Sequence, residues 1–131
     1  MTIESTGDST ANSDREAGTV FMPKFDSNGL LTAVVVNAKS GDLLMVAMMD
    51  QLAIDKTRET GIAHFHSRSR GKLWMKGESS GNILSVERIF VDCDQDSLVL
   101  ECTPAGPTCH TGARECFYRE LVGDELIRKS D

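Results

Sequence analysis

Leu30-Leu31-Thr32-Ala33-Val34-Val35-Val36 is the stretch that decides the fold. A β-branched, apolar run of this kind is typical of a buried strand. A second apolar run, Leu43 to Met49, follows after a short polar link that contains Gly41. Two such runs joined by a polar turn predict an antiparallel hairpin, and we expect the rest of the domain to be built onto it.

The segments after the hairpin predict one short helix and further strands. Asp50 can cap a helix that begins at Gln51, and Gly61 is placed to end it. Further strand-like segments are Leu73–Lys76, Ile83–Val91 and Ser97–Glu101. The fold class that we expect is α+β, a small single domain of mostly antiparallel strands with one or two short helices.

Length and charge limit the classes of function. The chain has 131 residues, of which 40% are hydrophobic, and this fits one domain with a modest core. A formal net charge of −6 and a pI near 5.0 argue against a nucleic-acid or acidic-membrane binder, because the overall field repels polyanions. A phosphate-bearing ligand must therefore bind at a local basic patch.

Both ends of the chain are polar. We expect a disordered N-terminal tail over residues 1–20, a folded domain over 21–122 and a polar C-terminal tail over 123–131 that frays. No apolar run approaches the length of a membrane span, and the first residues lack the pattern of a secretory signal. We therefore expect a cytoplasmic protein, in which four reduced cysteines favour metal ligation or burial over disulfides.

An acidic cluster, Asp92-Cys93-Asp94-Gln95-Asp96, lies between the last two predicted strands, at a hairpin turn. In an extended segment, Asp92 and Asp94 share one face and Cys93 points the other way. Three carboxylates this close repel one another unless a cation lies among them, and oxygen ligands suit Mg²⁺ or Ca²⁺. A solvated acidic turn is the alternative, whereas an EF-hand is excluded because the Gly and the final Glu of its loop are missing.

Three cysteines are candidates for a second metal site. Cys109 and Cys116 are seven residues apart, which on a straight helix would separate their Cα atoms by roughly 10.5 Å, whereas two thiolates on one zinc ion lie about 3.8 Å apart. Either the segment bends, with Gly112 the natural place, or the two do not share a metal. Together with Cys93 they could make a three-thiolate site with one open position, the arrangement of a catalytic zinc. Cys102 lies outside this set and is expected to be a buried, inert thiol.

The histidines offer proton carriers. His110 directly follows Cys109, so we expect it near the metal as a general acid or base or as a fourth ligand. His64 and His66 would share one face of a strand. They either line the site or are ordinary surface or packed histidines.

A basic run is the candidate phosphate site. Four cations lie within nine residues, namely Arg68, Arg70, Lys72 and Lys76. Arginine can bind a phosphate in bidentate fashion, and Trp74 in the same run could stack on a base. The alternative is a solvated strand edge with Trp74 in the core.

Four motifs, in order along the chain, carry a resemblance to a known family. They are Ser67-Arg68-Ser69-Arg70, Leu73-Trp74-Met75-Lys76-Gly77-Glu78-Ser79-Ser80-Gly81, Asp92-Cys93-Asp94-Gln95-Asp96, and Gly106-Pro107-Thr108-Cys109-His110-Thr111-Gly112 with Cys116-Phe117. Over roughly Phe25 to Leu121 the chain resembles phosphoribosyl-AMP cyclohydrolase of histidine biosynthesis. Some members are fused to a phosphoribosyl-ATP pyrophosphatase domain, and we expect this chain to be the monofunctional form.

The resemblance implies a homodimer with zinc at the subunit interface, bound by Cys93 of one chain and by Cys109 and Cys116 of the other. It also implies Mg²⁺ held by Asp92, Asp94 and Asp96. The implied reaction is hydrolysis of the N1–C6 bond in the adenine ring of N1-(5-phosphoribosyl)-AMP by a zinc-activated water, with proton transfers by His110. The substrate-binding residues would be Arg68, Arg70, Trp74, Lys76 and Glu78.

Two readings from other classes remain open at this point. A zinc-dependent purine deaminase would attack the same carbon, but its H-x-E and P-C-x-x-C signature is absent. A non-catalytic, zinc-stabilised dimer would use the same cysteines with a closed coordination shell. No nucleic acid or membrane partner is expected under any of these readings.

Overall fold

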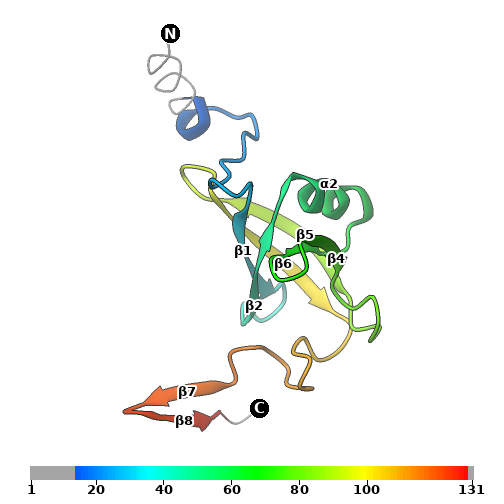
Figure 1. The fold of residues 1–131 in the computed structure, drawn as a ribbon, viewed down its shortest axis with the longest axis vertical. Helices are drawn as coiled ribbons and strands as arrows, with labels where there is room; N and C mark the ends of the chain where they lie inside the picture. The colour runs from blue at the N-terminus through cyan, green and yellow to red at the C-terminus, as the bar shows by residue number, and fades with distance from the viewer. Residues whose placement is uncertain (1–13, 130–131) are drawn as a thin grey trace.

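Residues 14–129 are described by a computed structural model, in which a six-stranded sheet carries one helix and is followed by a separate two-stranded hairpin (Figure 1). The elements are β1 Leu31–Asn37, β2 Leu43–Met49, α2 Gln51–Thr60, β3 His64–Ser67, β4 Lys72–Met75, β5 Leu84–Val91, β6 Ser97–Pro104, β7 Arg119–Val122 and β8 Glu125–Arg128. The strand order in the large sheet is β4-β3-β2-β1-β6-β5. The expected α+β class, with mostly antiparallel strands, is confirmed.

The predicted hairpin is the centre of the sheet. β1 and β2 pair antiparallel, with Leu31 opposite Met49 and Ala33 opposite Ala47. Alternate residues of a strand face the same side, so Leu31, Ala33 and Val35 are all buried. They join one hydrophobic core with residues of α2, β3, β5 and β6. The apolar stretch therefore decides the fold by giving the flanking strands a surface to pack on.

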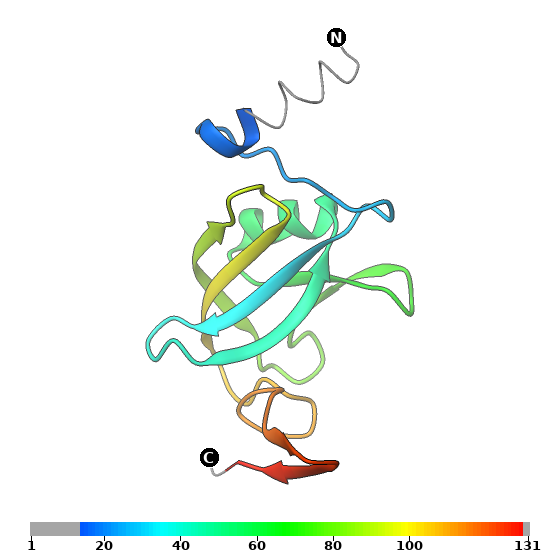
Figure 2. The same cartoon turned by 90° about the vertical axis from the view of Figure 1, so that its left-hand side faces the viewer.

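The predicted helix is confirmed at both ends. The Asp50 carboxylate accepts a hydrogen bond of 2.8 Å from the Ala53 N–H, and Gly61, with φ 75°, ends the helix by donating to the Thr57 carbonyl. Ala53 and Ile54 are buried, so α2 covers one face of the sheet (Figure 2). Within residues 14–129 no helix is long and apolar enough to cross a membrane.

β6 places two functional segments at opposite ends of the molecule. It pairs antiparallel with β5, as predicted, and parallel with β1. The acidic turn precedes its first residue, and the segment with Cys109 and Cys116 follows its last (Figure 1). The strand has eight residues, so at about 3.3 Å per residue the two segments are separated by about 23 Å.

The two ends of the chain differ in part from expectation. Most of the predicted disordered tail lies outside the described residues, but residues 14–17 are helical. The Gln95 side chain binds this helix and the segment that follows it, with its Nε2 donating to the Arg15 carbonyl at 2.7 Å and its Oε1 accepting from the Met22 N–H at 2.6 Å. At the other end, the predicted fraying from Gly123 is wrong for residues 125–128. These residues form β8, because they pair in register with β7 across the turn at Gly123.

Candidate active site

The acidic turn brings three carboxylates together. One oxygen from each of Asp92, Asp94 and Asp96 lies within 4.8 Å of the others. Asp92 Oδ1 accepts hydrogen bonds of 3.0 Å from the N–H groups of Asp96 and Ser97, which folds the loop back on itself. The turn also needs a left-handed residue, and Gln95 takes that conformation with φ 59°. The local backbone therefore positions the cluster.

The carboxylates of this turn do not titrate independently. Partial desolvation raises the pKa of Asp92, but hydrogen bonds from Asp96 and from the Ser97 N–H outweigh it, and the pKa is lowered. Hydrogen bonding to Asp92 and Asp94 raises the pKa of Asp96. The three groups thus share a proton most easily at Asp96, and a divalent cation would take the place of that proton. Three convergent carboxylates are a donor set that fits Mg²⁺.

Cys109 and Cys116 form a pair of thiols. Of the two alternatives that the sequence left open, the structure has the bend at Gly112, since this residue has φ 92° and its N–H donates to the Cys109 carbonyl at 3.0 Å. The Cys116 N–H donates to the Leu44 carbonyl at 2.7 Å, which fixes the end of the bend against β2. The bend thus places the two cysteines close enough for each thiol to affect the pKa of the other. Two neighbouring thiols are a donor set that fits zinc.

The two thiols differ in acidity. The Thr111 hydroxyl donates to Cys109 Sγ at 3.0 Å, and this bond lowers the pKa of Cys109. Desolvation and the neighbouring Cys109 sulfur raise the pKa of Cys116. One thiolate is therefore favoured even without a metal, and a bound cation would favour both.

No single chain completes the three-cysteine site. Among the described residues, the three aspartates are the only group of three or more potential ligands that converge, so neither His110 nor Cys93 joins the thiol pair. Cys93 is exposed in the acidic turn, at the other end of β6. The separation of about 23 Å along β6 cannot be bridged by a ligand side chain.

A cavity of about 390 Å³ lies beside the thiol pair. Its lining includes candidate site residues from the sequence analysis, namely Arg70, Trp74, Lys76, Glu78, Cys109 and His110. Glu78 is held in the loop after β4, where its Oε1 accepts the Met75 N–H at 2.9 Å. The candidate proton carrier, one thiol and four predicted substrate-binding side chains therefore face one space.

A second cavity of about 330 Å³ adjoins the β3–β4 turn. Arg68 and Arg70 line it together with the hydroxyls of Ser67 and Ser69. Arg70 and Trp74 border both cavities. The turn thus offers two guanidinium groups and two hydroxyls to an anion, next to the cavity that contains the thiol.

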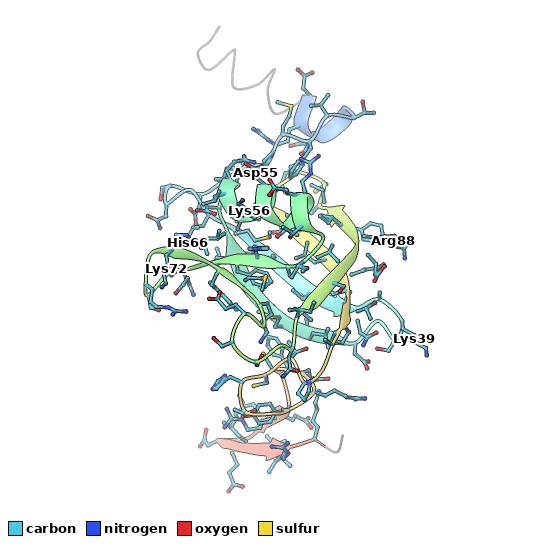
Figure 3. All side chains as sticks on the ribbon, turned by 90° about the vertical axis from the view of Figure 1, so that its right-hand side faces the viewer. Lys39, Asp55, Lys56, His66, Lys72 and Arg88 are labelled. Atoms are coloured by element: carbon cyan, nitrogen blue, oxygen red, sulfur yellow. The ribbon has the colours of Figure 1, made fainter. Side chains whose placement is uncertain are left out.

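The two strand histidines have different surroundings. His64 is buried, and its Nδ1 lies 2.8 Å from the Ile62 carbonyl, so it is a packed histidine. His66 borders the second cavity, with its Nδ1 3.3 Å from Asp50 Oδ2. Figure 3 shows His66 and Lys72 on the same side of the molecule, away from Arg88 on β5. His66, rather than His64, lies where a ligand could meet it.

Cys102 has the environment that the sequence predicted. Its side chain is fully buried in β6 and belongs to the hydrophobic core. Desolvation, with a smaller contribution from Glu87, raises its pKa to about 12. The thiol is therefore inert near neutral pH.

Three polar residues near the site were not recognised in the sequence. Thr111 lies two residues after Cys109 in a tight turn. Hydroxyls often form local hydrogen bonds at this spacing, so the sequence contained a signal for its contact with Cys109. Thr108 is buried and its hydroxyl has no hydrogen-bond partner among the described atoms. Gln95 gave no local signal, because its side-chain partners Arg15 and Met22 are distant in sequence.

Gly77 is required by the loop that borders the larger cavity. We expect Gly77→Ala to lower the free energy of unfolding by about 2–4 kcal/mol, because φ is +87° and a Cβ would lie 2.5 Å from the Asn82 carbonyl carbon and the Ile83 nitrogen. Gly81→Ala is the matched control, since φ is similar at +81° but no atom lies within 4 Å. We expect a loss of only about 1 kcal/mol there. Urea unfolding at equal protein concentration measures both, and equal losses would contradict the steric argument.

Comparisons with known proteins agree with the arrangement of these motifs. The family model described as "Phosphoribosyl-AMP cyclohydrolase" matches residues 45–118, just over half of the chain. A protein of that name from Erythrobacter litoralis is 64% identical over 108 residues, covering 82% of this chain and 86% of the relative. Proteins of the same name from Brucella anthropi and Rhizorhabdus wittichii are 60% and 53% identical, over 83% and 88% of this chain and 79% and 94% of their own lengths.

Proposed function

The chain belongs to the phosphoribosyl-AMP cyclohydrolase family, and from that premise we propose how its residues perform the reaction. It is an enzyme of histidine biosynthesis that hydrolyses the N1–C6 bond in the adenine ring of N1-(5-phosphoribosyl)-AMP. The catalytic centre is a zinc ion shared by two subunits of a homodimer, and the cell compartment is the cytoplasm. The observation that carries this proposal is the Cys109–Cys116 thiol pair at the edge of the cavity with His110.

The length of β6 supports a shared zinc. The thiol pair lacks a third convergent ligand among the described residues of its own chain, and Cys93 is exposed beyond the other end of β6, which is about 23 Å long. In a symmetric dimer with antiparallel β6 strands, Cys93 of each subunit meets the thiol pair of the other. This arrangement makes two equivalent sites, each with three thiolates. Zinc, when bound, supplies a Lewis acid that makes a water molecule nucleophilic near neutral pH.

Mg²⁺ fits the three aspartates of the same turn. Asp92 and Asp94 are the immediate neighbours of Cys93 in sequence, so both metals belong to one composite site. The carboxylates would hold the cation, and the cation would orient a phosphate or hydroxyl of the substrate. The pKa changes within the cluster support this role, because the carboxylates are crowded without a cation.

Proton transfer and substrate binding are assigned to side chains of this chain. In the reaction a water oxygen bonds to C6, the N1–C6 bond breaks, and a proton reaches N1, which gives the formimino-aminoimidazole carboxamide ribonucleotide. His110 borders the cavity and carries the proton, while Trp74 and Glu78 hold the base and ribose. Lys76 faces the same cavity, and Arg68 and Arg70 bind one of the two substrate phosphates from the β3–β4 turn.

Turnover of N1-(5-phosphoribosyl)-AMP, followed by ultraviolet absorbance, tests the metal proposal. We expect activity to disappear when zinc is removed by a chelator and to return when zinc is restored. Magnesium alone should not restore it, because a thiolate set favours zinc. Full turnover by zinc-free protein would contradict a catalytic zinc, while leaving the family assignment unaffected.

Arg68→Ala tests the assignment of the second cavity. We expect KM to rise about tenfold to a hundredfold with kcat within about twofold, because a charge-assisted phosphate contact is lost from substrate and transition state alike. Zinc content should stay unchanged, since Arg68 lies in a turn that contains none of the proposed ligands. Lys72→Ala is the matched control, since this exposed cation follows the same turn but borders neither cavity. A wild-type KM for Arg68→Ala would remove this residue from the phosphate site.

A further inference from the structure

Within residues 14–129 the C-terminal hairpin is not joined to the six-stranded sheet. β7 and β8 pair only with each other, and every residue in them is exposed. Its apolar side chains are 68%, 53%, 53% and 48% exposed, in the order Leu121, Val122, Leu126 and Ile127. A two-stranded hairpin is marginally stable in water without a surface to pack on. No other strand of residues 14–129 supplies such a surface, and exposed apolar patches of this kind mark interaction sites.

The two faces of the hairpin differ in charge. Residues opposite each other in an antiparallel pair point to the same side. On one side Leu121 and Leu126 lie with Arg119 and Arg128, whose guanidinium groups stack on Tyr118 at 5.3 and 4.9 Å. The other side carries Val122 and Ile127 with Glu120 and Glu125. We call this second side the acidic face of the hairpin; each of its two cross-strand pairs joins one apolar and one acidic side chain.

A matching surface lies at the opposite end of the subunit. A cavity of about 500 Å³ there is lined by apolar side chains that include Val20, Phe21, Ile54, Ile89 and Val91. We call it the α2 cavity, since the last two of these come from β5 and Ile54 comes from the helix.

The α2 cavity combines exposed apolar surface with cationic groups. Val20, which lines the cavity, is 67% exposed, so this part of the cavity is open to solvent. Arg15 and Arg58 line it, and the Arg58 guanidinium lies 5.7 Å from the ring of Phe21. Glu16 and Asp92 also border it, but two hydrogen bonds from backbone N–H groups engage the Asp92 carboxylate. Docking of the acidic face would bring Glu120 and Glu125 toward Arg58, whereas docking of the other face would bring Arg119 and Arg128 toward it.

Geometry assigns the hairpin to the cavity of a second copy. The hairpin and the helix α2 lie toward opposite ends of one subunit (Figures 1 and 2), and residues of α2 line the α2 cavity. If zinc is shared, Cys116 of one copy lies beside Cys93 of the other, and Cys93 borders the α2 cavity. β7 begins three residues after Cys116, a span of at most about 10 Å. The link is therefore too short to take the hairpin far from the partner's cavity.

We infer that each copy of this chain docks the acidic face of its β7–β8 hairpin into the α2 cavity of a second copy, so that the dimer exchanges two C-terminal arms. The inference rests on the shared-zinc proposal for the placement of the hairpin, but the arm contact itself needs no metal. Its tests are therefore made in zinc-free protein, where failure of the arm contact is distinguishable from failure of the zinc site.

Complementary charge reversal tests the pairing. One chain carries Arg58→Glu, which gives the cavity the sign of the arm, and the other carries Glu120→Arg and Glu125→Arg, which give the arm the sign of the cavity. We expect each variant alone to form homodimers with a Kd raised about tenfold, because like charges then face each other. In an equal mixture both contacts are attractive, so native mass spectrometry should find mixed dimers in excess of the statistical half.

Substitution of the two hairpin faces tests which side docks. We expect Val122→Ser with Ile127→Ser to raise the dimer Kd about a hundredfold by analytical ultracentrifugation, because two apolar side chains per arm are lost from the contact. Leu121→Ser with Leu126→Ser is the matched control on the other face and should change Kd less than tenfold. Wild-type Kd values in all variants, with a statistical mixture in the charge experiment, would overturn the inference.

Discussion

An equal mixture of Cys93→Ala and Cys109→Ala chains should recover about a quarter of wild-type activity, although each variant alone should lose about a thousandfold or more. After subunit exchange, half of the dimers are mixed. In a mixed dimer one of the two sites combines an intact Cys93 with an intact Cys109 and Cys116, and the other site lacks both. The recovery follows from the distance along β6, which prevents one chain from supplying all three thiolates.

The control is an equal mixture of Cys109→Ala chains and Cys116→Ala chains. Both residues belong to the same thiol pair, so no dimer of these two chains contains an intact pair. This mixture should remain inactive. If the first mixture also remained inactive while mixed dimers formed, the three ligands would have to come from one chain or the zinc would have to be bound elsewhere. Zinc content per dimer, measured on the same samples, should rise and fall with activity.

His110→Ala should lower kcat by about a hundredfold to ten-thousandfold, the range for a lost general acid or base. KM and zinc content should remain within about twofold of wild type, because His110 borders the cavity but does not join the thiol pair. Steady-state turnover and metal analysis of the same preparation measure all three quantities.

His66→Ala is the matched control for His110. This histidine borders the neighbouring cavity beside Arg68, so its loss should act mainly on KM. If His110→Ala lost its zinc, the side chain would be a fourth ligand and not the proton carrier. A kcat equal to that of the wild-type enzyme would exclude both roles.

Local structure was predictable wherever the sequence pattern is itself local. The β1–β2 hairpin follows from two apolar runs and a polar turn, and α2 follows from Asp50 and Gly61 at its ends. The bend between Cys109 and Cys116 was one of two alternatives that the incompatibility between helix geometry and zinc geometry left open, and the structure decided between them. The polar C-terminal segment was misjudged, because Leu126 and Ile127 are too few to give a clear strand pattern before their pairing with β7 is known.

The sequence by itself determined which thiols and carboxylates are candidate metal ligands and which local elements carry them, because residue type and short spacing are sufficient for both. Only the tertiary structure decided that β1 lies parallel to β6 and that the acidic turn and the thiol pair stand at opposite ends of that strand. Pairing between strands so far apart in the chain depends on which apolar faces are buried together, and no local period encodes it. Because strand pairing places Cys93 and the thiol pair beyond opposite ends of β6, the thiol pair has no third ligand within residues 14–129. In our proposal a second subunit supplies that ligand.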